Sequence, residues 1–416
     1  MKKLIIFLAV CLIFLPSMYA EETHHEPEFS DIDDAPHTPR SVSMKRGFEF
    51  GIDINALFSN NLLTVGEVFS DTIIIDVDRI SQGLMASFGV GAGFSINIDS
   101  KKGWGFGFSF GLEGTGIFNT GSILSFNDVK DEPMDLGGAL YAVADINTFF
   151  HVQKFKIIFN PSMFWAAAYF NPNITYTLNT NDGIKFGINA REVRVYTAMP
   201  YELLMDEGIF ELTGSPGFDL TLGVEYPLAK EMGITSKIPF LDFDVGIGFQ
   251  NIPIVPSILR DYYGMPDINN HEIDLMDMIT GSSESEENKL DTDFTSGKAE
   301  ASFDRAFKLL LYANWRPLFG SKLLTVTPVL GLSHDFLYAQ KVSFEGGVTG
   351  TLNLADMFYA SFGINYFDRV WINSLDLAVN LRAFQLDLGI DMRSQDFIRS
   401  WSAGGLGIKV GLKFGW

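Results

Sequence analysis

The amino-acid sequence predicts an all-β protein, a transmembrane antiparallel β-barrel of about 14 strands. Three observations predict this fold class: alternation of apolar with small or polar residues, a secretory-type N-terminus, and no later apolar run near the roughly 20 residues of a spanning helix. Successive strand residues point to opposite faces, so alternation gives each strand one apolar face. Such a sheet satisfies its backbone groups inside a membrane only by closing on itself.

The end of the chain shows the alternation most clearly. Apolar side chains occupy even positions, with glycine or lysine between them: Leu406, Ile408, Val410, Leu412, Phe414 and Trp416. No helix keeps such a split between two faces, because its period is 3.6 residues rather than 2. A chain that ends on this strand leaves an open edge unless the first strand covers it, which favours a closed barrel.

The N-terminus predicts export. Lys2 and Lys3 precede the apolar run 4–15, and the small residue Ala20 follows at the expected cleavage point. We therefore predict a signal peptide over residues 1–20. Cys11 falls in its apolar core rather than at a lipoprotein site, so the mature chain has no cysteine for a disulfide framework.

An acidic segment, residues 21–46, follows the predicted cleavage point. Its charge and irregular pattern predict a loosely held periplasmic leader, and the alternative is a hatch that folds back to plug the barrel. The formal net charge of the chain, −21, argues against nucleic acid as a partner. It argues equally against electrostatic docking on anionic lipid.

Residues 47–416 supply the predicted barrel. Alternation predicts strands near 47–58, 84–98, 104–112, 138–151, 154–170, 218–226 and 241–249, then a regular series from 307 to the C-terminus. Many reach the roughly 9–11 residues that a tilted spanning strand needs, whereas strands of a soluble β-sandwich, the alternative fold, are typically about 5–6 residues long. Aromatic residues recur near the strand ends, as an interfacial girdle requires.

Three insertions interrupt the strands, at 60–83, 191–214 and 251–303. The first holds a short helical stretch and a β-rich stretch, and the second resembles a loop in which residues 201–206 could form a helix. The third contains Pro253 and Pro256 and shows no strand period, which predicts a long loop. In a barrel, long loops gather at one end and short turns at the other.

Residues for catalysis, cofactors or metals do not cluster in the sequence, so we predict a protein that is not an enzyme and binds no cofactor. His151 and His334 lie in or beside predicted strands, and neither has a serine at the spacing of a nucleophile motif. The Gly-x-Gly pairs recur with strand period, which is typical of lumen-facing glycines rather than phosphate loops. The sequence assigns no ligand-binding residue.

The signal peptide, alternating strands and terminal aromatic residue together resemble a Gram-negative-type outer-membrane protein. Leu412, Phe414 and Trp416 resemble the C-terminal signal that the barrel-assembly machinery of that class reads. Length, strand number and short leader resemble the 14-stranded long-chain fatty acid transporters of the FadL type and their relatives in double-membraned spirochaetes. The resemblance implies an outer-membrane location, membrane lipid and assembly machinery as partners, and a hydrophobic small-molecule ligand.

Three functions follow as hypotheses. The resemblance implies a channel or transporter for hydrophobic small molecules such as long-chain fatty acids. The first alternative is a general or cation-preferring porin, because acidic residues recur on the predicted lumen face: Glu49, Asp53, Asp99, Glu113, Asp242 and Asp244. The second alternative is a surface adhesin or antigen that presents the 251–303 insertion as its binding surface.

Overall fold

The protein is described from a computed structural model. The structure describes residues 48–61, 85–100, 104–120, 129–179, 185–191, 193–198, 214–238, 240–264, 268–274, 295–318, 323–338, 341–355, 357–381, 383–402 and 404–415. The expected signal peptide, the 21–46 leader, most of the 60–83 insertion and Trp416 lie outside these ranges. What the sequence predicts for these segments therefore stays a prediction.

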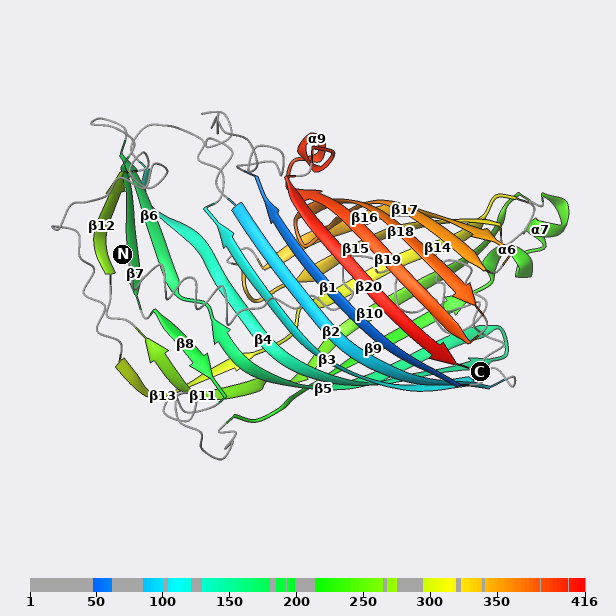
Figure 1. Cartoon of the computed structure of the whole chain (residues 1–416), viewed down its shortest axis with the longest axis horizontal. Coiled ribbons are helices and arrows are strands. Elements are labelled where there is room, and N and C mark those ends of the chain that lie inside the picture. Colours follow the sequence, from blue (N-terminus) through cyan, green and yellow to red (C-terminus); the bar gives the residue numbers. More distant parts are fainter. Residues whose placement is uncertain are drawn as a thin grey trace.

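Antiparallel strands close into a 14-stranded barrel, as the sequence predicts. In ring order they are β1 (Phe48–Asn60), β2 (Met85–Ser100), β3 (Trp104–Asn119), β4 (Val129–Val152), β5 (Phe155–Phe170), β9 (Gly217–Tyr226), β10 (Asp242–Val255), β14 (Phe307–Arg316), β15 (Leu324–His334), β16 (Val342–Leu354), β17 (Phe358–Phe367), β18 (Val370–Leu381), β19 (Phe384–Ser394) and β20 (Gly405–Gly415). Figure 1 shows β1 between β2 and β20, where the two ends of the chain complete the inclined wall.

Apolar side chains cover the outer face of the wall. In β1, Ile52, Ile54 and Phe58 are exposed, whereas Glu49 and Asn55 on the other face are buried. The same alternation runs through the later strands and leaves apolar residues exposed around the barrel. Soluble proteins rarely expose contiguous apolar surface beyond a few hundred Å². This exterior is therefore that of a barrel in contact with lipid.

The two ends of the barrel differ (Figure 1). The turn end, where β1 begins and β20 ends, carries tight connections such as that at Gln153, whose φ is 58°, and two short helices, α6 (Leu228–Glu231) and α7 (Ile234–Lys237). The opposite loop end carries α9 (Phe397–Ser400) and additional strands, β6 (Asn173–Asn179), β7 (Lys185–Arg191), β8 (Arg194–Thr197), β11 (Ser257–Gly264), β12 (Ile268–Asp274) and β13 (Thr295–Phe303). Within the described ranges, no helix has the length and apolarity needed to cross a membrane.

The 251–303 insertion is more ordered than its sequence indicates. β10 continues to Val255, and the insertion contributes β11, β12 and β13. β11 pairs with β8 and β13, and β12 pairs with β7, so these strands extend the sheet beyond the barrel at the loop end. The prediction that the segment lacks strand structure is wrong, because Pro253 sits at a bulge of β10 and Pro256 separates β10 from β11 without ending the sheet. Residues 275–294 lie outside the described ranges.

Candidate functional site

The inner face of the barrel carries a buried apolar cluster, here called the lumen cluster. It consists of Phe149, Ile158, Leu310, Tyr312, Val329, Phe367, Val370 and Ile372. The neighbours of these residues along the strands, such as Phe150, Phe159 and Leu311, are exposed on the lipid side. Side chains alternate along a strand, so the cluster points into the barrel. The lumen is therefore apolar in part.

A second buried cluster lies nearer the loop end and is here called the loop-end cluster. It consists of Ala139, Val143, Phe164, Ala166, Ala198, Leu259 and Phe303, with Tyr141, Tyr169 and Tyr196 packed against it. Phe303, at the end of β13, joins the cluster to β4 and β5. The centroid of its ring lies 5.2 Å from that of Tyr141, 5.6 Å from that of Tyr169 and 6.1 Å from that of Phe164. β13 ends at Phe303 and thereby brings this ring from the extended sheet to the barrel wall.

Sequence reasoning missed both clusters because it assigned apolar residues to the lipid face. One signal was available. Leu309–Tyr312 is an unbroken apolar run, and a strand without polar alternation is apolar on both faces. Leu310 and Tyr312 indeed point inward while Leu311 is exposed to lipid.

A cavity of about 430 Å³ opens at the loop end and is here called the loop-end pocket. Four aromatic rings line it, from Tyr169, Phe303, Phe336 and Tyr338, together with the aliphatic side chains of Met134, Ile174 and Leu337. Its polar lining includes Asp135, Asp304 and Lys341. The volume falls within the roughly 300–1,000 Å³ typical of small-molecule sites. Because Phe303 lines the pocket and belongs to the loop-end cluster, the pocket adjoins the apolar part of the lumen.

The connection between β15 and β16 supplies one wall of this pocket, and hydrogen bonds hold it in place. Asn171 Nδ2 donates to the carbonyl oxygen of Phe336 and to the hydroxyl of Tyr169, at 3.2 Å in both cases. Within the connection, the backbone nitrogen of Leu337 donates to Asp335 Oδ1 at 2.9 Å. The guanidinium of Arg369 lies over the Tyr338 ring, 4.1 Å from its centroid. The aromatic wall is thus fixed to β5 and to the β17–β18 turn.

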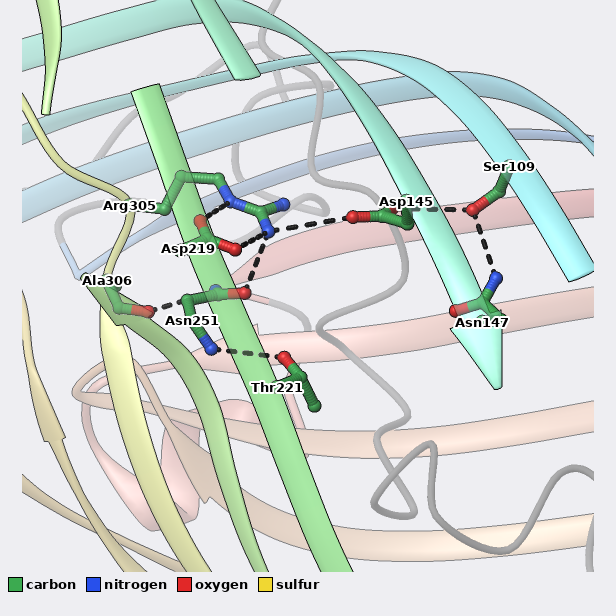
Figure 2. A network of polar contacts seen from close by, with 8 residues as sticks. All are labelled: Ser109, Asp145, Asn147, Asp219, Thr221, Asn251, Arg305 and Ala306. Atoms are coloured by element: carbon green, nitrogen blue, oxygen red, sulfur yellow. Dashed lines mark hydrogen bonds and ion pairs between the residues drawn. The ribbon is translucent and has the colours of Figure 1, made fainter. Parts of the chain in front are cut away.

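A charged network lies on the inner face of the wall beside the loop-end cluster (Figure 2). Arg305, between β13 and β14, donates from Nε and Nη2 to both oxygens of Asp219 at 2.7 and 2.8 Å. Its Nη2 also lies 3.7 Å from an oxygen of Asp145, which accepts a hydrogen bond from Ser109. The guanidinium packs over the ring of Phe164 at 5.7 Å. Burial of both Arg305 and Asp219 makes this pair a fixed part of the wall.

Beside this network, the pairing of β9 with β10 is broken at Asn251, and the side chain of Asn251 forms hydrogen bonds there instead (Figure 2). The residue has φ of 51°, and the register of β9 and β10 shifts on either side of Ile252 and Pro253. Its Nδ2 donates to the carbonyl of Ala306 at 3.0 Å, and its Oδ1 accepts from Arg305 at 2.9 Å. A β-bulge of this kind bends the strand and leaves the ladder locally unpaired.

A second irregularity lies between β4 and β5. Their pairing runs to Asp145↔Ser162 and resumes at Phe149↔Ile158, so it is interrupted around Pro161. Proline has no backbone N–H to donate to a ladder. The side chain of Asn160 bridges part of the interruption, because its Oδ1 accepts from the backbone nitrogen of Thr148 at 2.8 Å. β4, β5, β9 and β10 are consecutive in the ring, and we call this arc the interrupted seam.

The acidic residues proposed for a porin lumen are not equivalent. Glu49 and Glu113 are buried, and Asp53 is half-buried on the inner face of β1. Asp242 and Asp244 both accept hydrogen bonds from Arg316, at 2.7 and 2.8 Å, so one of their two negative charges is compensated. The side chain of Asp99 lies outside the described part.

The residues of the predicted assembly signal lie in the closing strand. Leu412 pairs with Ile52 of β1 and Leu386 of β19, and Phe414 is exposed with its ring 5.4 Å from that of Phe384. Trp416 is outside the described residues. The recognition of these residues by an assembly machinery stays a prediction.

The two histidines of the predicted strands lie at opposite ends of the barrel, so they do not form a catalytic group with each other. His151 is exposed beside Phe149 at the turn end, and His334 packs against Phe336 near the loop-end pocket at 4.6 Å between ring centroids. Among the side chains that the structure describes, His, Cys, Asp and Glu do not gather in groups of three or more that would hold a metal ion.

Solved structures that share this fold include the following two. A FadL homologue from Pseudomonas aeruginosa superposes with a TM-score of 0.52 at 9% identity, covering 96% of this chain and 98% of that chain. The toluene transporter TbuX of Ralstonia pickettii superposes with a TM-score of 0.50 at 8% identity, covering 97% and 100%. No family model matches the chain, and no curated protein is significantly similar in sequence. The chain thus has the fold of a FadL-type transport barrel, as its sequence resemblance implied.

Proposed function

We propose that this protein is an outer-membrane transporter for small hydrophobic molecules. The observation that carries the proposal is the lumen cluster, which places buried aromatic and aliphatic side chains on the inner face of the barrel. A porin keeps a polar, water-filled lumen, so an apolar inner face favours hydrophobic solutes over ions. The transport function of the similarly folded proteins supports the same class. Long-chain fatty acids are one substrate within it.

The apolar features supply a route from the loop end inward. A solute would first occupy the loop-end pocket, whose aromatic rings give it apolar contact outside the barrel. Phe303 connects that pocket to the loop-end cluster, and the lumen cluster lies further along β4 and β5. At each step the solute contacts apolar side chains, so it is never fully exposed to water.

The interrupted seam is the proposed exit to the membrane. At this arc the wall is held by side chains of Asn160, Asn251 and Arg305 in place of continuous backbone ladders. Separation of strands costs least where backbone hydrogen bonds are fewest. A hydrophobic solute that leaves sideways enters lipid directly.

The proposal predicts a closed pore. Planar-bilayer recordings of the refolded chain 21–416 should show little steady current, because apolar side chains occupy the lumen. A long-chain fatty acid should bind saturably in the same preparation. Large, steady channels would instead identify an open porin and overturn the transporter. Absence of both current and binding would shift the function to a surface role of the loop-end strands.

If the solute leaves through the interrupted seam, cross-linking β4 to β5 should stop uptake. Across the interruption, continuing the register from Asp145↔Ser162 to Phe149↔Ile158 sets position 147 opposite position 160, so Asn147→Cys with Asn160→Cys places two cysteines there. Oxidation should reduce transfer of a hydrophobic fluorescent probe into liposomes by about tenfold, since a disulfide fixes the two strands together. Reduction should restore transfer. The mature chain has no other cysteine, because the chain's one cysteine, Cys11, lies in the expected signal peptide.

A matched control locks an intact ladder. Ser333 and Ser343 face each other on β15 and β16 with their hydroxyl oxygens 2.7 Å apart. The pair Ser333→Cys with Ser343→Cys should cross-link readily and leave uptake unchanged. Equal loss of uptake in both cross-linked proteins would contradict a lateral exit at the seam.

The porin and adhesin hypotheses have less support. Arg316 compensates one of the two negative charges of Asp242 and Asp244, which weakens the case for a cation-preferring pore. For the adhesin, the ordered strands β11–β13 give the 251–303 insertion a defined surface. A deletion within 275–294 that abolishes binding to a host component but spares solute uptake would favour the adhesin.

A further inference from the structure

The loop-end pocket has two acidic side chains and one basic side chain in its lining, and the basic one is the more exposed. Asp135 and Asp304 contribute carboxylates, and Lys341 contributes an ammonium group. Lys341 is exposed and lies 5.7 Å from the centroid of the Phe336 ring, at the rim of the pocket. The lining thus has more negative than positive charge, and its cation is the more solvated group.

Asp304 is a polar side chain of this lining with a buried acceptor that no described donor uses. Its Oδ1 is buried and accepts no hydrogen bond within the part of the chain that the structure describes. The adjacent Arg305 does not serve it, because that guanidinium is directed at Asp219 and Asp145. A buried carboxylate oxygen without a donor is unfavourable. Asp304 as a whole is half-buried and lines the pocket, so a rotation of its carboxylate that turns this oxygen toward a donor on a bound molecule would stabilise it.

The electrostatic surroundings of Asp304 also favour a donor. The residue lies between β13 and β14, and burial together with repulsion from Asp219 raises the pKa of its carboxyl group above the usual value. A ligand carboxylate placed beside it would add further repulsion, whereas a cationic or neutral donor would relieve it. Asp135 reinforces this preference, although it already accepts a hydrogen bond from Asn119 at 3.0 Å.

We propose that the loop-end pocket binds small aromatic molecules that carry a hydrogen-bond donor, an amine or a hydroxyl group, and that it discriminates against carboxylates. The half-buried rings of Tyr169 and Phe336 contact the apolar part of the ligand, with the buried rings of Phe303 and Tyr338 packed behind them, and Asp304 accepts its donor. This inference rests on the proposed function, since it specifies the solute that the transporter takes up first. A pocket that disfavours carboxylates would not be the site that binds the head group of a fatty acid.

The test compares three ligands that share one ring. Phenethylamine, 2-phenylethanol and phenylacetate are titrated calorimetrically against the refolded chain 21–416 in a non-ionic detergent. We expect the amine to bind at least about tenfold more tightly than phenylacetate, with the alcohol between them. Asp304→Asn should reduce the ratio of amine to carboxylate affinity to about threefold or less, because the amide no longer carries a negative charge. The alcohol should lose little.

Two further variants make the result specific. Lys341→Gln removes the rim cation and should widen the discrimination against phenylacetate. Glu300→Gln removes one negative charge from β13 at an exposed residue outside the pocket lining, so it should leave all three affinities unchanged. Each variant must first show the heat-dependent change in gel migration of the folded barrel.

Some outcomes would overturn the inference without touching transport. Phenylacetate binding as tightly as phenethylamine, or unchanged discrimination in Asp304→Asn, would show that Asp304 does not select the ligand. Absence of binding by all three, in a protein that still transfers a neutral hydrophobic probe into liposomes, would show that the pocket is not the uptake site. An open porin in the bilayer recording would overturn the proposed function instead.

Discussion

Arg305→Ala should lower the free energy of unfolding of the barrel by about 3–5 kcal/mol, the cost of breaking a buried ion pair by removing one partner. Asp219, which is 2% exposed, would keep its negative charge without either hydrogen bond that Arg305 donates at 2.7 and 2.8 Å. Asp145 would lose its cationic neighbour at 3.7 Å as well. Asp145 and Asp219, which flank Ser162 of β5 on the inner face of the wall, would then repel each other.

Urea unfolding of the refolded protein in lipid bilayers, followed by tryptophan fluorescence, measures this loss. Arg260→Ala is the matched control, because Arg260 pairs with Glu300 at 3.6 Å while both side chains are exposed. Exposed pairs contribute only about 0–1 kcal/mol, so this variant should unfold almost as the parent does. A comparable loss in both variants would mean that the charged network of Figure 2 does not stabilise the wall.

The barrel could be predicted from the sequence because one face of each strand is exposed to lipid and the other is enclosed in the lumen. A strand such as β20 must alternate apolar and small residues in order to satisfy both environments, and its pairing with β1 follows from the need to remove edges. The positions of β1, β2, β9 and β14–β20 accordingly agree with the alternation in the sequence. The outward-facing positions of Phe414 and Leu330 follow from the same pattern.

The candidate site was not predictable in this way, because it depends on contacts between distant parts of the chain. Arg305 meets Asp219 across 86 residues of sequence, and neither residue breaks the strand pattern around it. The loop-end pocket needs the end of β5, the end of β13 and the β15–β16 connection to lie together. β13 itself was overlooked, since its insertion contains prolines that are typical of loops. Periodicity indicates the face on which a residue lies and carries no information about which distant residue will contact it.

The membrane assignment itself predicts that an arginine will be far more damaging on the outer face than on the inner one. Val348 and Thr349 are neighbours near the middle of β16, where Val348 is exposed to lipid and Thr349 points inward beside Ser374 and Asn365. Val348→Arg should destabilise the folded barrel in bilayers by about 2–4 kcal/mol, the cost of a cation near the bilayer midplane. Thr349→Arg, which has polar neighbours, should lose less than half of that.

The comparison of these two variants separates lipid exposure from a simple change of size, because both introduce the same side chain into the same strand. In detergent micelles, where the outer face is less strictly excluded from water, the difference between them should shrink. Equal destabilisation of the two variants in bilayers would mean that the outer face of β16 is not in lipid. That result would remove the basis for a lateral route through the wall, since a solute leaving at the interrupted seam would then meet water instead of a membrane.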